Sequence, residues 1–268
     1  MTIKYNRKTR KQTLRYKMYK SLGGNKSSSK VNTNKTDNLK DIIISQEWAG
    51  LGDNLQYTTL PELYSKLGHN VYISSQNQCR NSEICDLVWK LNPYIKGISD
   101  LPANVGSMIE FKFITTSYIK NIERSHGIFN GYRKYPVIYY KPKRISKIDK
   151  FIFYDTTSHS SKPTDLQFET SFESIFSKHP DLIPRRIDFT KIENRIVKNF
   201  THEPYTINNI FEYCDLLASC KVFICGFSGS AVLASAIKQD KKSPIIYSFK
   251  DSNTAVYIFD NVNYSKWL

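Results

Sequence analysis

The sequence lacks any apolar run long enough to cross a membrane, and no apolar segment follows Met1 as a secretory signal peptide would require. Hydrophobic residues make up 40% of the 268 residues, enough to build a substantial core, but they occur in short runs. We therefore expect a protein that stays in the cytoplasm and folds into one or two domains.

Cysteine pairs with metal-binding spacing are also missing. The five cysteines form no Cys-x-x-Cys motif and their number is odd, which favours reduced thiols over a disulfide framework. No cluster of cysteine and histidine has the spacing of a zinc site. Cys214 and Cys225 lie within apolar patterns, so we expect both in the core.

Common nucleotide- and metal-binding signatures fail on particular residues. A dinucleotide fingerprint starting at Gly50 and Gly52 would need a third glycine where the chain has Leu55. Residues 24–27 have neither the spacing of a Walker A loop nor a strand before them. No Asp-x-Asp pair is present to hold a divalent cation. The sequence thus disfavours NAD binding, P-loop ATP hydrolysis and a metal site, and we expect no cofactor.

Acidic residues are scarce at the start of the chain. Residues 1–40 carry twelve lysines and arginines against one acid, Asp37, so they account for +11 of the formal net charge of +15. A segment with so few apolar residues does not bury enough surface to fold. We expect a disordered basic tail over residues 1–40. It either contacts polyanions, such as nucleic acid or an anionic membrane surface, or only solvates the protein.

From Asp41 onward, apolar runs typical of strands alternate with spacing typical of helices. We expect strands over residues 42–45, 71–74 and 111–114 and helices near residues 60–67, 83–91 and 118–123. These elements form an N-terminal Rossmann-like domain over residues 41–147. It ends in a linker over residues 135–147, which are rich in proline and basic residues.

A second series defines a C-terminal Rossmann-like domain over residues 148–268. Its clearest helix places Ile207, Ile210, Phe211, Cys214 and Leu217 on one face. We expect further helices through residues 172–176 and 230–238, and strands over residues 151–154, 186–189, 222–225 and 244–249. The predicted fold class is α/β, with two Rossmann-like domains facing a cleft.

A glycine-rich turn with a carboxylate follows the first predicted strand. Gly50 and Gly52 allow the backbone to turn sharply and to approach a ligand, and Asp53 and Asn54 follow them. Loops at this position carry the chemistry of many α/β proteins, and a carboxylate there can take a proton from a bound hydroxyl. The alternative is an ordinary tight turn in which Asp53 caps the next helix.

A second turn, of small residues, opens the helix near residue 230. Ser228, Gly229, Ser230 and Ala231 bring backbone N–H groups to the start of that helix, where the macrodipole adds about half a positive charge. This arrangement indicates a site for an anion such as a diphosphate. The alternative is a strand-to-helix turn whose serines only cap the helix.

The two turns together resemble a known family. The sequence GLGDN at residues 50–54, with TLP at 59–61, is similar to the N-terminal loop of heptosyltransferase-like glycosyltransferases of GT-B fold, the ADP-heptose:LPS heptosyltransferase type. Residues 207–237 resemble that family's nucleotide-sugar motif, and NPYI at 92–95 resembles a segment that precedes a strand there. The basic tail and the Lys/Asn/Ile-rich composition are similar to those of proteins from large DNA viruses.

The resemblance implies a function for each part of the chain. The N-terminal domain would bind the acceptor, with Asp53 as catalytic base, and the C-terminal domain would bind a nucleotide sugar, with Ser228 and Gly229 at its diphosphate. We expect an inverting, metal-independent glycosyltransferase that acts on the hydroxyl of a glycan or another acceptor. Further cleft residues would be His159, Lys162, Arg185 and Arg186, although each is also explained as a structural or surface residue.

Two residues depart from the family pattern and support a different hypothesis. The acidic residue before the Ser/Thr-Gly turn is replaced by Phe227, and a histidine that often follows is replaced by Val232. The alternative is a non-catalytic protein: a degenerate glycosyltransferase fold, or a basic-tailed module that binds nucleic acid or associates with virions. Binding of nucleoside diphosphates separates the two hypotheses. A nucleic-acid module should not bind these ligands, and its affinity for nucleic acid should fall steeply with salt.

Deleting residues 1–40 tests the assignment of the tail. We expect the unfolding transition to stay nearly unchanged, because these residues carry none of the α/β pattern, and any salt-sensitive binding to a polyanion to disappear. Thermal melts and nucleic-acid titrations at two salt concentrations measure both effects. A large loss of melting temperature would show that the tail packs onto the fold.

Overall fold

The computed structural model describes residues 40–105, 118–129, 131, 133–157, 163–197, 200–238, 245–251 and 259–268. All of these belong to one compact unit of the chain. The strand expected at residues 111–114 and the side chains of His159 and Lys162 lie outside the described residues.

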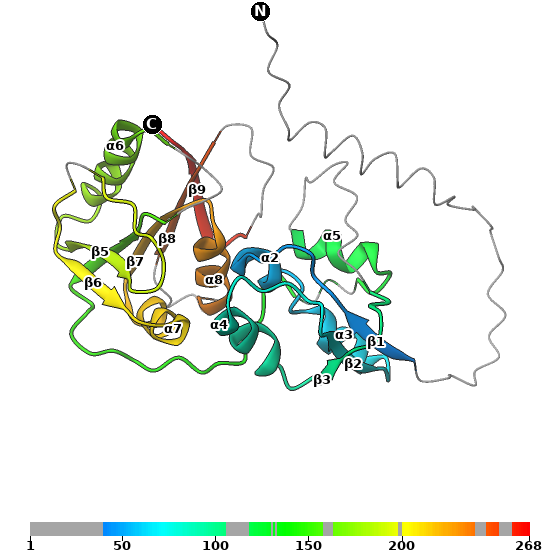
Figure 1. Ribbon diagram of the computed structural model, residues 1–268. Coiled ribbons are helices and arrows are strands. Elements are labelled where there is room, and N and C mark those ends of the chain that lie inside the picture. The colour runs from blue at the N-terminus through cyan, green and yellow to red at the C-terminus, as the bar shows by residue number, and fades with distance from the viewer. Residues whose placement is uncertain are drawn as a thin grey trace, which may run out of the picture. The chain divides into compact units, whose positions relative to one another are not determined.

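The first sheet is parallel and has the order β1-β2-β3 (Figure 1). Its strands are β1 (Asp41–Ile44), β2 (Asn70–Ser74) and β3 (Ile95–Ser99). Ile44 also forms an isolated parallel bridge with Val105, on the side of β1 away from β2. β1 therefore lies between β2 and the segment that contains Val105. The loop after β1 thus lies at a switch point, where consecutive segments are placed on opposite sides of β1.

The second sheet is parallel throughout and has the order β6-β5-β4-β7-β8-β9. This is the Rossmann strand order, and its switch point lies between β4 and β7, the position where ligands bind in open α/β sheets. The strands are β4 (Phe151–Asp155), β5 (Ile183–Phe189), β6 (Pro204–Ile207), β7 (Val222–Gly226), β8 (Ile245–Lys250) and β9 (Val262–Lys266).

Short helices connect the strands and begin at polar caps. The side chains of Asn81, Thr164, Asn209 and Ser228 each accept a backbone N–H at a helix start. The helices are α2 (Leu51–Leu55), α3 (Leu60–Lys66), α4 (Ser82–Cys85), the π-helix η1 (Asp86–Lys90), α5 (Tyr118–Ser125), α6 (Asp165–Phe176), α7 (Ile210–Ser219) and α8 (Gly229–Ile237). No helix of the described residues has the length and apolarity needed to span a bilayer.

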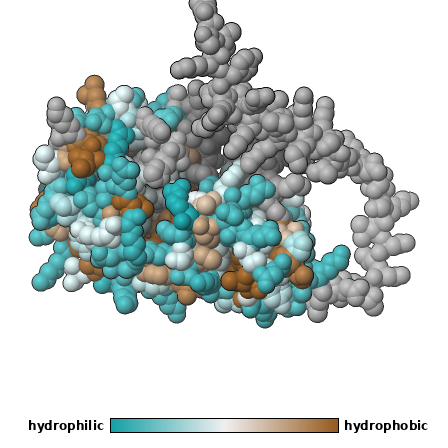
Figure 2. Space-filling model, viewed as in Figure 1, coloured by the Kyte–Doolittle hydropathy of each residue, from teal (hydrophilic) through white to brown (hydrophobic). Residues whose placement is uncertain are grey.

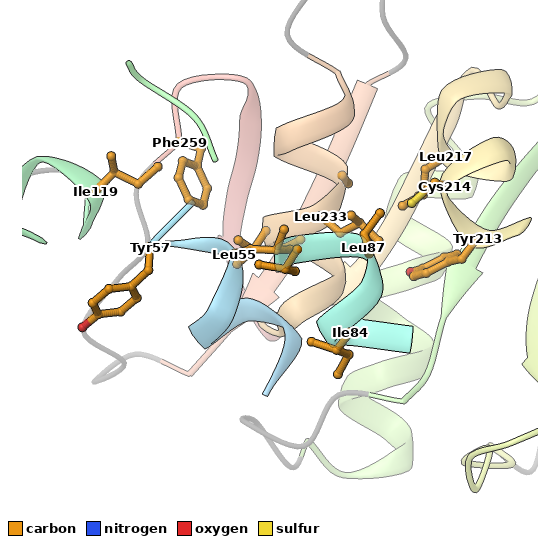
Figure 3. Close-up of a cluster of buried hydrophobic side chains, with 14 of the residues drawn as sticks. Leu55, Tyr57, Ile84, Leu87, Ile119, Tyr213, Cys214, Leu217, Leu233 and Phe259 are labelled. Atoms are coloured by element: carbon orange, nitrogen blue, oxygen red, sulfur yellow. The ribbon is translucent and has the colours of Figure 1, made fainter. Parts of the chain in front are cut away.

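One buried cluster joins the two halves. Figure 3 shows Leu55 of α2, Leu87 of η1 and Leu233 of α8 close together, with Tyr213 and Leu217 of α7 further along the same core. These leucines and Tyr213 are at most 3% exposed. The face of the molecule in Figure 2 is mostly hydrophilic, with separate hydrophobic patches. The core is therefore continuous beneath the two loops that the sequence singled out.

The expected linker is irregular but tightly bound to its surroundings. The backbone N–H of Val137 donates to the Thr58 hydroxyl, and that of Ile145 donates to the Ser219 hydroxyl, each at 2.8 Å. Thr58 belongs to the N-terminal half and Ser219 ends α7. The segment therefore connects both halves instead of forming a free tether.

The predicted α/β alternation is confirmed, but β3, β6 and β9 were not among the strands expected from the sequence. Other differences occur at element boundaries. Ile207 was expected in the helix that contains Ile210, but it ends β6, and α7 begins only after the Asn209 cap. The helix expected over residues 83–91 is a short α-helix followed by a π-helix. Cys214 and Cys225 are buried, as expected, and all five cysteines are free thiols.

Candidate active site

A cavity of about 210 Å³ lies where the loops after β1 and β7 meet. The first loop contributes Gly50, Leu51, Gly52 and Asp53 to its wall, and the second contributes Ser228, Gly229 and Ser230. The sequence thus identified two loops, far apart in the chain, that the fold brings to one cavity. This position coincides with the switch points of both sheets.

The first loop enters α2 with Gly50 as the N-cap residue, so Asp53 lies inside the first turn and does not cap the helix. The Asp53 side chain folds back over Gly50: a Cβ atom at Gly50 would lie 2.5 Å from Asp53 Oδ2. A glycine is needed there because any larger residue would displace the carboxylate. Gly50 therefore determines the position of the Asp53 carboxylate at the cavity wall.

Burial raises the pKa of Asp53 to about 6. The charge of Arg80 and a hydrogen bond from the backbone N–H of Gly50 oppose this rise but do not cancel it. A carboxylate with this pKa is ionised at neutral pH yet basic enough to accept a proton, which is the range that general bases occupy. Arg80 also lines the cavity.

Asn54, expected at the site, is instead fully buried behind it. Its amide donates to the carbonyl oxygens of Trp48, Gly50 and Gln78 at 3.0–3.1 Å, and its oxygen accepts the indole N–H of Trp89 at 2.8 Å. Asn54 is not part of the cavity wall. It holds the loop in shape by joining three carbonyl groups from different parts of the chain through one amide.

The second loop begins α8 with Ser228 as its cap. The Ser228 Oγ accepts the N–H of Ser230 at 3.3 Å, and the carbonyl of Ser228 accepts the N–H of Ala231 at 3.1 Å. Ala231 is 1% exposed and does not line the cavity. Gly229, which follows the cap, brings its backbone to the cavity wall.

The two glycines of the loops touch each other. A Cβ atom at Gly229 would lie 2.8 Å from the Gly52 nitrogen, and one at Gly52 would lie 3.0 Å from the Gly229 Cα and 3.3 Å from Val232. α2 and α8 therefore pack backbone to backbone (Figure 1). The glycine at position 229 permits this contact, a role that the sequence alone did not indicate.

Two arginines expected in the cleft lie elsewhere. Arg185 pairs with Glu203 at 2.5 Å and stacks on the Phe151 ring, whereas Arg186 binds both carboxylate oxygens of Asp188 at 2.7 and 2.9 Å. Neither lines the cavity. Both lie along β5, and their guanidinium groups are engaged on the sheet itself.

Other cavity residues were missed by the sequence reasoning. Glu83 of α4 accepts the Ile210 N–H at 2.8 Å and pairs with Lys191, so it links the N-terminal half to the start of α7. Asn209 was a readable signal, since an asparagine before an apolar helix is a strong N-cap. The sequence around Glu83 and Lys191 carries no such signal, because these two residues come to the cavity from opposite halves of the chain. Among the described residues, no three metal-ligating side chains cluster.

Solved structures with this fold include glycosyltransferases. The chain matches the glycosyl transferase family 9 protein of Veillonella parvula DSM 2008 with a TM-score of 0.56 and 9% identity, over 85% of each chain. It matches E. coli ADP-heptose LPS heptosyltransferase II with a TM-score of 0.57 and 8% identity, over 84% of this chain and 90% of that one.

A third similar structure is longer than this chain. It is the iron-containing dodecameric glycosyltransferase TibC of enterotoxigenic E. coli H10407, matched with a TM-score of 0.54 and 18% identity over 80% of this chain. The match spans 60% of the length of TibC. No protein-family model and no curated protein sequence matches the chain. At these identities the likeness establishes the expected GT-B-like α/β fold.

Replacing Gly229 with alanine tests the contact between the loops. Because the new Cβ would meet the Gly52 backbone, we expect Gly229→Ala to lower the free energy of unfolding by about 1–3 kcal/mol. Gly97→Ala is the matched control: nothing lies within 4 Å of a Cβ there, so its effect should stay within about 0.5 kcal/mol. Urea unfolding measures both. Equal effects of the two variants on the free energy of unfolding would show that the close contact between α2 and α8 does not contribute to stability.

The pH dependence of stability tests the environment of Asp53. Its folded-state pKa of about 6 exceeds the ordinary 3.8, so the folded chain holds this proton more strongly, and the resulting stabilisation is lost as pH rises from about 4 through 6. Asp53→Asn cannot lose a proton. We therefore expect it to be more stable than the parent above pH 6 and equally stable below pH 4, in urea unfolding at several pH values. A constant difference at all pH values would contradict the assignment.

Proposed function

We propose that this chain is a glycosyltransferase that moves a sugar from a nucleotide-diphosphate sugar to the hydroxyl of a glycan or another acceptor, with inversion and without a metal ion. The observation that carries the proposal is the cavity itself. It places a carboxylate with a pKa of about 6, Asp53, beside the N-terminus of α8, within a GT-B-like fold. A base and an anion site in one cavity are the two elements that such a transfer needs.

Asp53 would act as the general base. It takes the proton of the acceptor hydroxyl while that oxygen attacks the anomeric carbon of the donor. The new bond forms on the face opposite the leaving group, so the bond to the diphosphate breaks with inversion. The proton remains on Asp53, and the electron pair leaves with the diphosphate.

The leaving diphosphate would lie at the start of α8. The backbone of Gly229 lines the cavity there, and the helix dipole favours negative charge at this end. Arg80 is an exposed cation on the same cavity wall and supplies further positive charge. The E. coli structure named for ADP-heptose makes that nucleotide sugar the first donor to test.

The two departures from the family motif do not line the cavity. Phe227 is 3% exposed and packs near the Tyr264 ring, while Val232 is fully buried beneath Gly52. Both side chains fill the core under the loops. Because neither side chain reaches the cavity wall, these two departures do not remove a group from the proposed site, which favours a catalytic protein over the non-catalytic alternative.

Turnover of Asp53→Asn tests the proposed base. We expect turnover to fall about 10²-fold or more while donor affinity changes by less than about twofold, because a general base acts on the chemical step. In the parent, kcat/KM should fall below an apparent pKa of about 6, where Asp53 becomes protonated. Rates with ADP-heptose and with glucose conjugates of other nucleoside diphosphates, measured against a panel of glycan acceptors, provide the assay.

Glu47→Gln is the matched control, because Glu47 is an exposed carboxylate in the same loop that does not line the cavity. Its turnover should equal that of the parent. If Asp53→Asn retained full turnover, Asp53 would be removed from the mechanism. If the parent bound no nucleoside diphosphate of any common base in calorimetric titrations, the glycosyltransferase proposal would fail in favour of the non-catalytic alternative.

A further inference from the structure

A buried carboxylate lies directly behind the cavity wall. Asp155 ends β4 next to the switch point and is 1% exposed, yet it does not line the cavity. Its Oδ1 accepts the backbone N–H of Thr157 at 2.7 Å and the Thr157 hydroxyl at 2.6 Å. Its Oδ2 accepts the hydroxyls of Tyr213 at 3.1 Å and of Ser230 at 2.5 Å. Four donors thus converge on one carboxylate.

The three hydroxyl groups belong to residues that line the cavity. Thr157 follows β4, Tyr213 lies on α7 and Ser230 lies in the first turn of α8, and all three are on the wall in front of Asp155. Each hydroxyl has a single proton and spare lone pairs. Because each proton already points to Asp155, these oxygens have only lone pairs left for a ligand.

The tyrosine keeps its proton under all ordinary conditions. Burial, together with the negative charge of Asp155, holds the pKa of Tyr213 well above its usual value. Tyr213 therefore remains a hydroxyl that donates to Asp155.

We infer that Asp155 makes this part of the cavity a wall of hydrogen-bond acceptors, which binds hydroxyl groups of the ligand and repels its phosphates. The inference rests on the proposed function and deepens it, because sugar hydroxyls and ribose hydroxyls are the donor groups of a nucleotide sugar. It also separates the two serines of the second loop: Ser230 faces ligand hydroxyls, while the backbone at Ser228 and Gly229 remains the place for the diphosphate. Asp155 is a positioning residue, since it acts through the three hydroxyls.

Ser230→Ala tests the wall with a small change. The probes are inorganic pyrophosphate, the diphosphates of adenosine, uridine and guanosine, and their glucose conjugates, each titrated by calorimetry. We expect a loss of about 3- to 10-fold for the probes whose hydroxyls reach the wall, the range of one neutral hydrogen bond, and less than about twofold for pyrophosphate. Ser235→Ala is the matched control on the same helix, because its hydroxyl donates to Asn261 away from the cavity.

The pattern of losses identifies the ligand group. If ribose hydroxyls contact Ser230, the nucleoside diphosphates and their glucose conjugates weaken equally. If the sugar contacts it, only the glucose conjugates weaken. Both patterns support the inference.

Asp155→Asn gives a readout that a merely structural role would not produce. The asparagine amide donates to a hydroxyl, turns that proton toward the cavity and removes a negative charge, so pyrophosphate should bind more tightly than to the parent while the hydroxyl-bearing probes bind more weakly. A general loss of structure would instead lower the affinity of every probe, pyrophosphate included.

Two results would overturn the inference alone. One is a loss of pyrophosphate affinity in Ser230→Ala as large as the loss for the nucleotides, which would show that Ser230 donates to phosphate. The other is equal affinity of Ser230→Ala and Ser235→Ala for every probe. If the parent bound none of the probes, both the inference and the proposed function would fail.

Discussion

Backbone contact between Gly52 of α2 and Gly229 of α8 is the constraint on which the site depends. No side chain separates the two helices at this point, so the loop that carries Asp53 and the start of α8 border one cavity. A larger residue at either position would move one loop away from the other. The chemistry proposed here requires both loops at once, because one holds the base and the other holds the anion site.

Each loop is supported from behind by one buried polar residue with several hydrogen bonds. Asn54 binds three carbonyl groups and one indole beneath the first loop. Asp155 accepts four donors beneath the second loop. Buried polar groups are stable only when they are paired in this way, so each residue fixes the geometry of its loop. Neither lines the cavity, and both shape it.

Local signals in the sequence predicted most of the fold and both loops. Apolar spacing located most of the strands and helices, since burial of one face depends on residues a few positions apart, but it did not indicate β3, β6 or β9. The failure at Ile207 came from the same rule: its spacing fits the helix of Ile210, but the Asn209 cap starts that helix later. Cap chemistry was the better guide to that boundary.

The rest of the site depends on pairs that are distant in the chain. Nothing near Glu83 indicates Lys191 or the start of α7, and nothing near Gly229 indicates Gly52. Arg185 and Arg186 are charged and close to the expected cleft in sequence, yet their ion pairs keep them on β5. Only the three-dimensional arrangement distinguishes such residues from those that face a ligand.

Hydrogen exchange with and without a nucleoside diphosphate is the most direct test of the claim that both loops build one site. The account predicts that the ligand slows exchange in residues 50–55 and in residues 228–232 together, while β9 is unchanged. Protection confined to residues 1–40, or to one loop without the other, would contradict it.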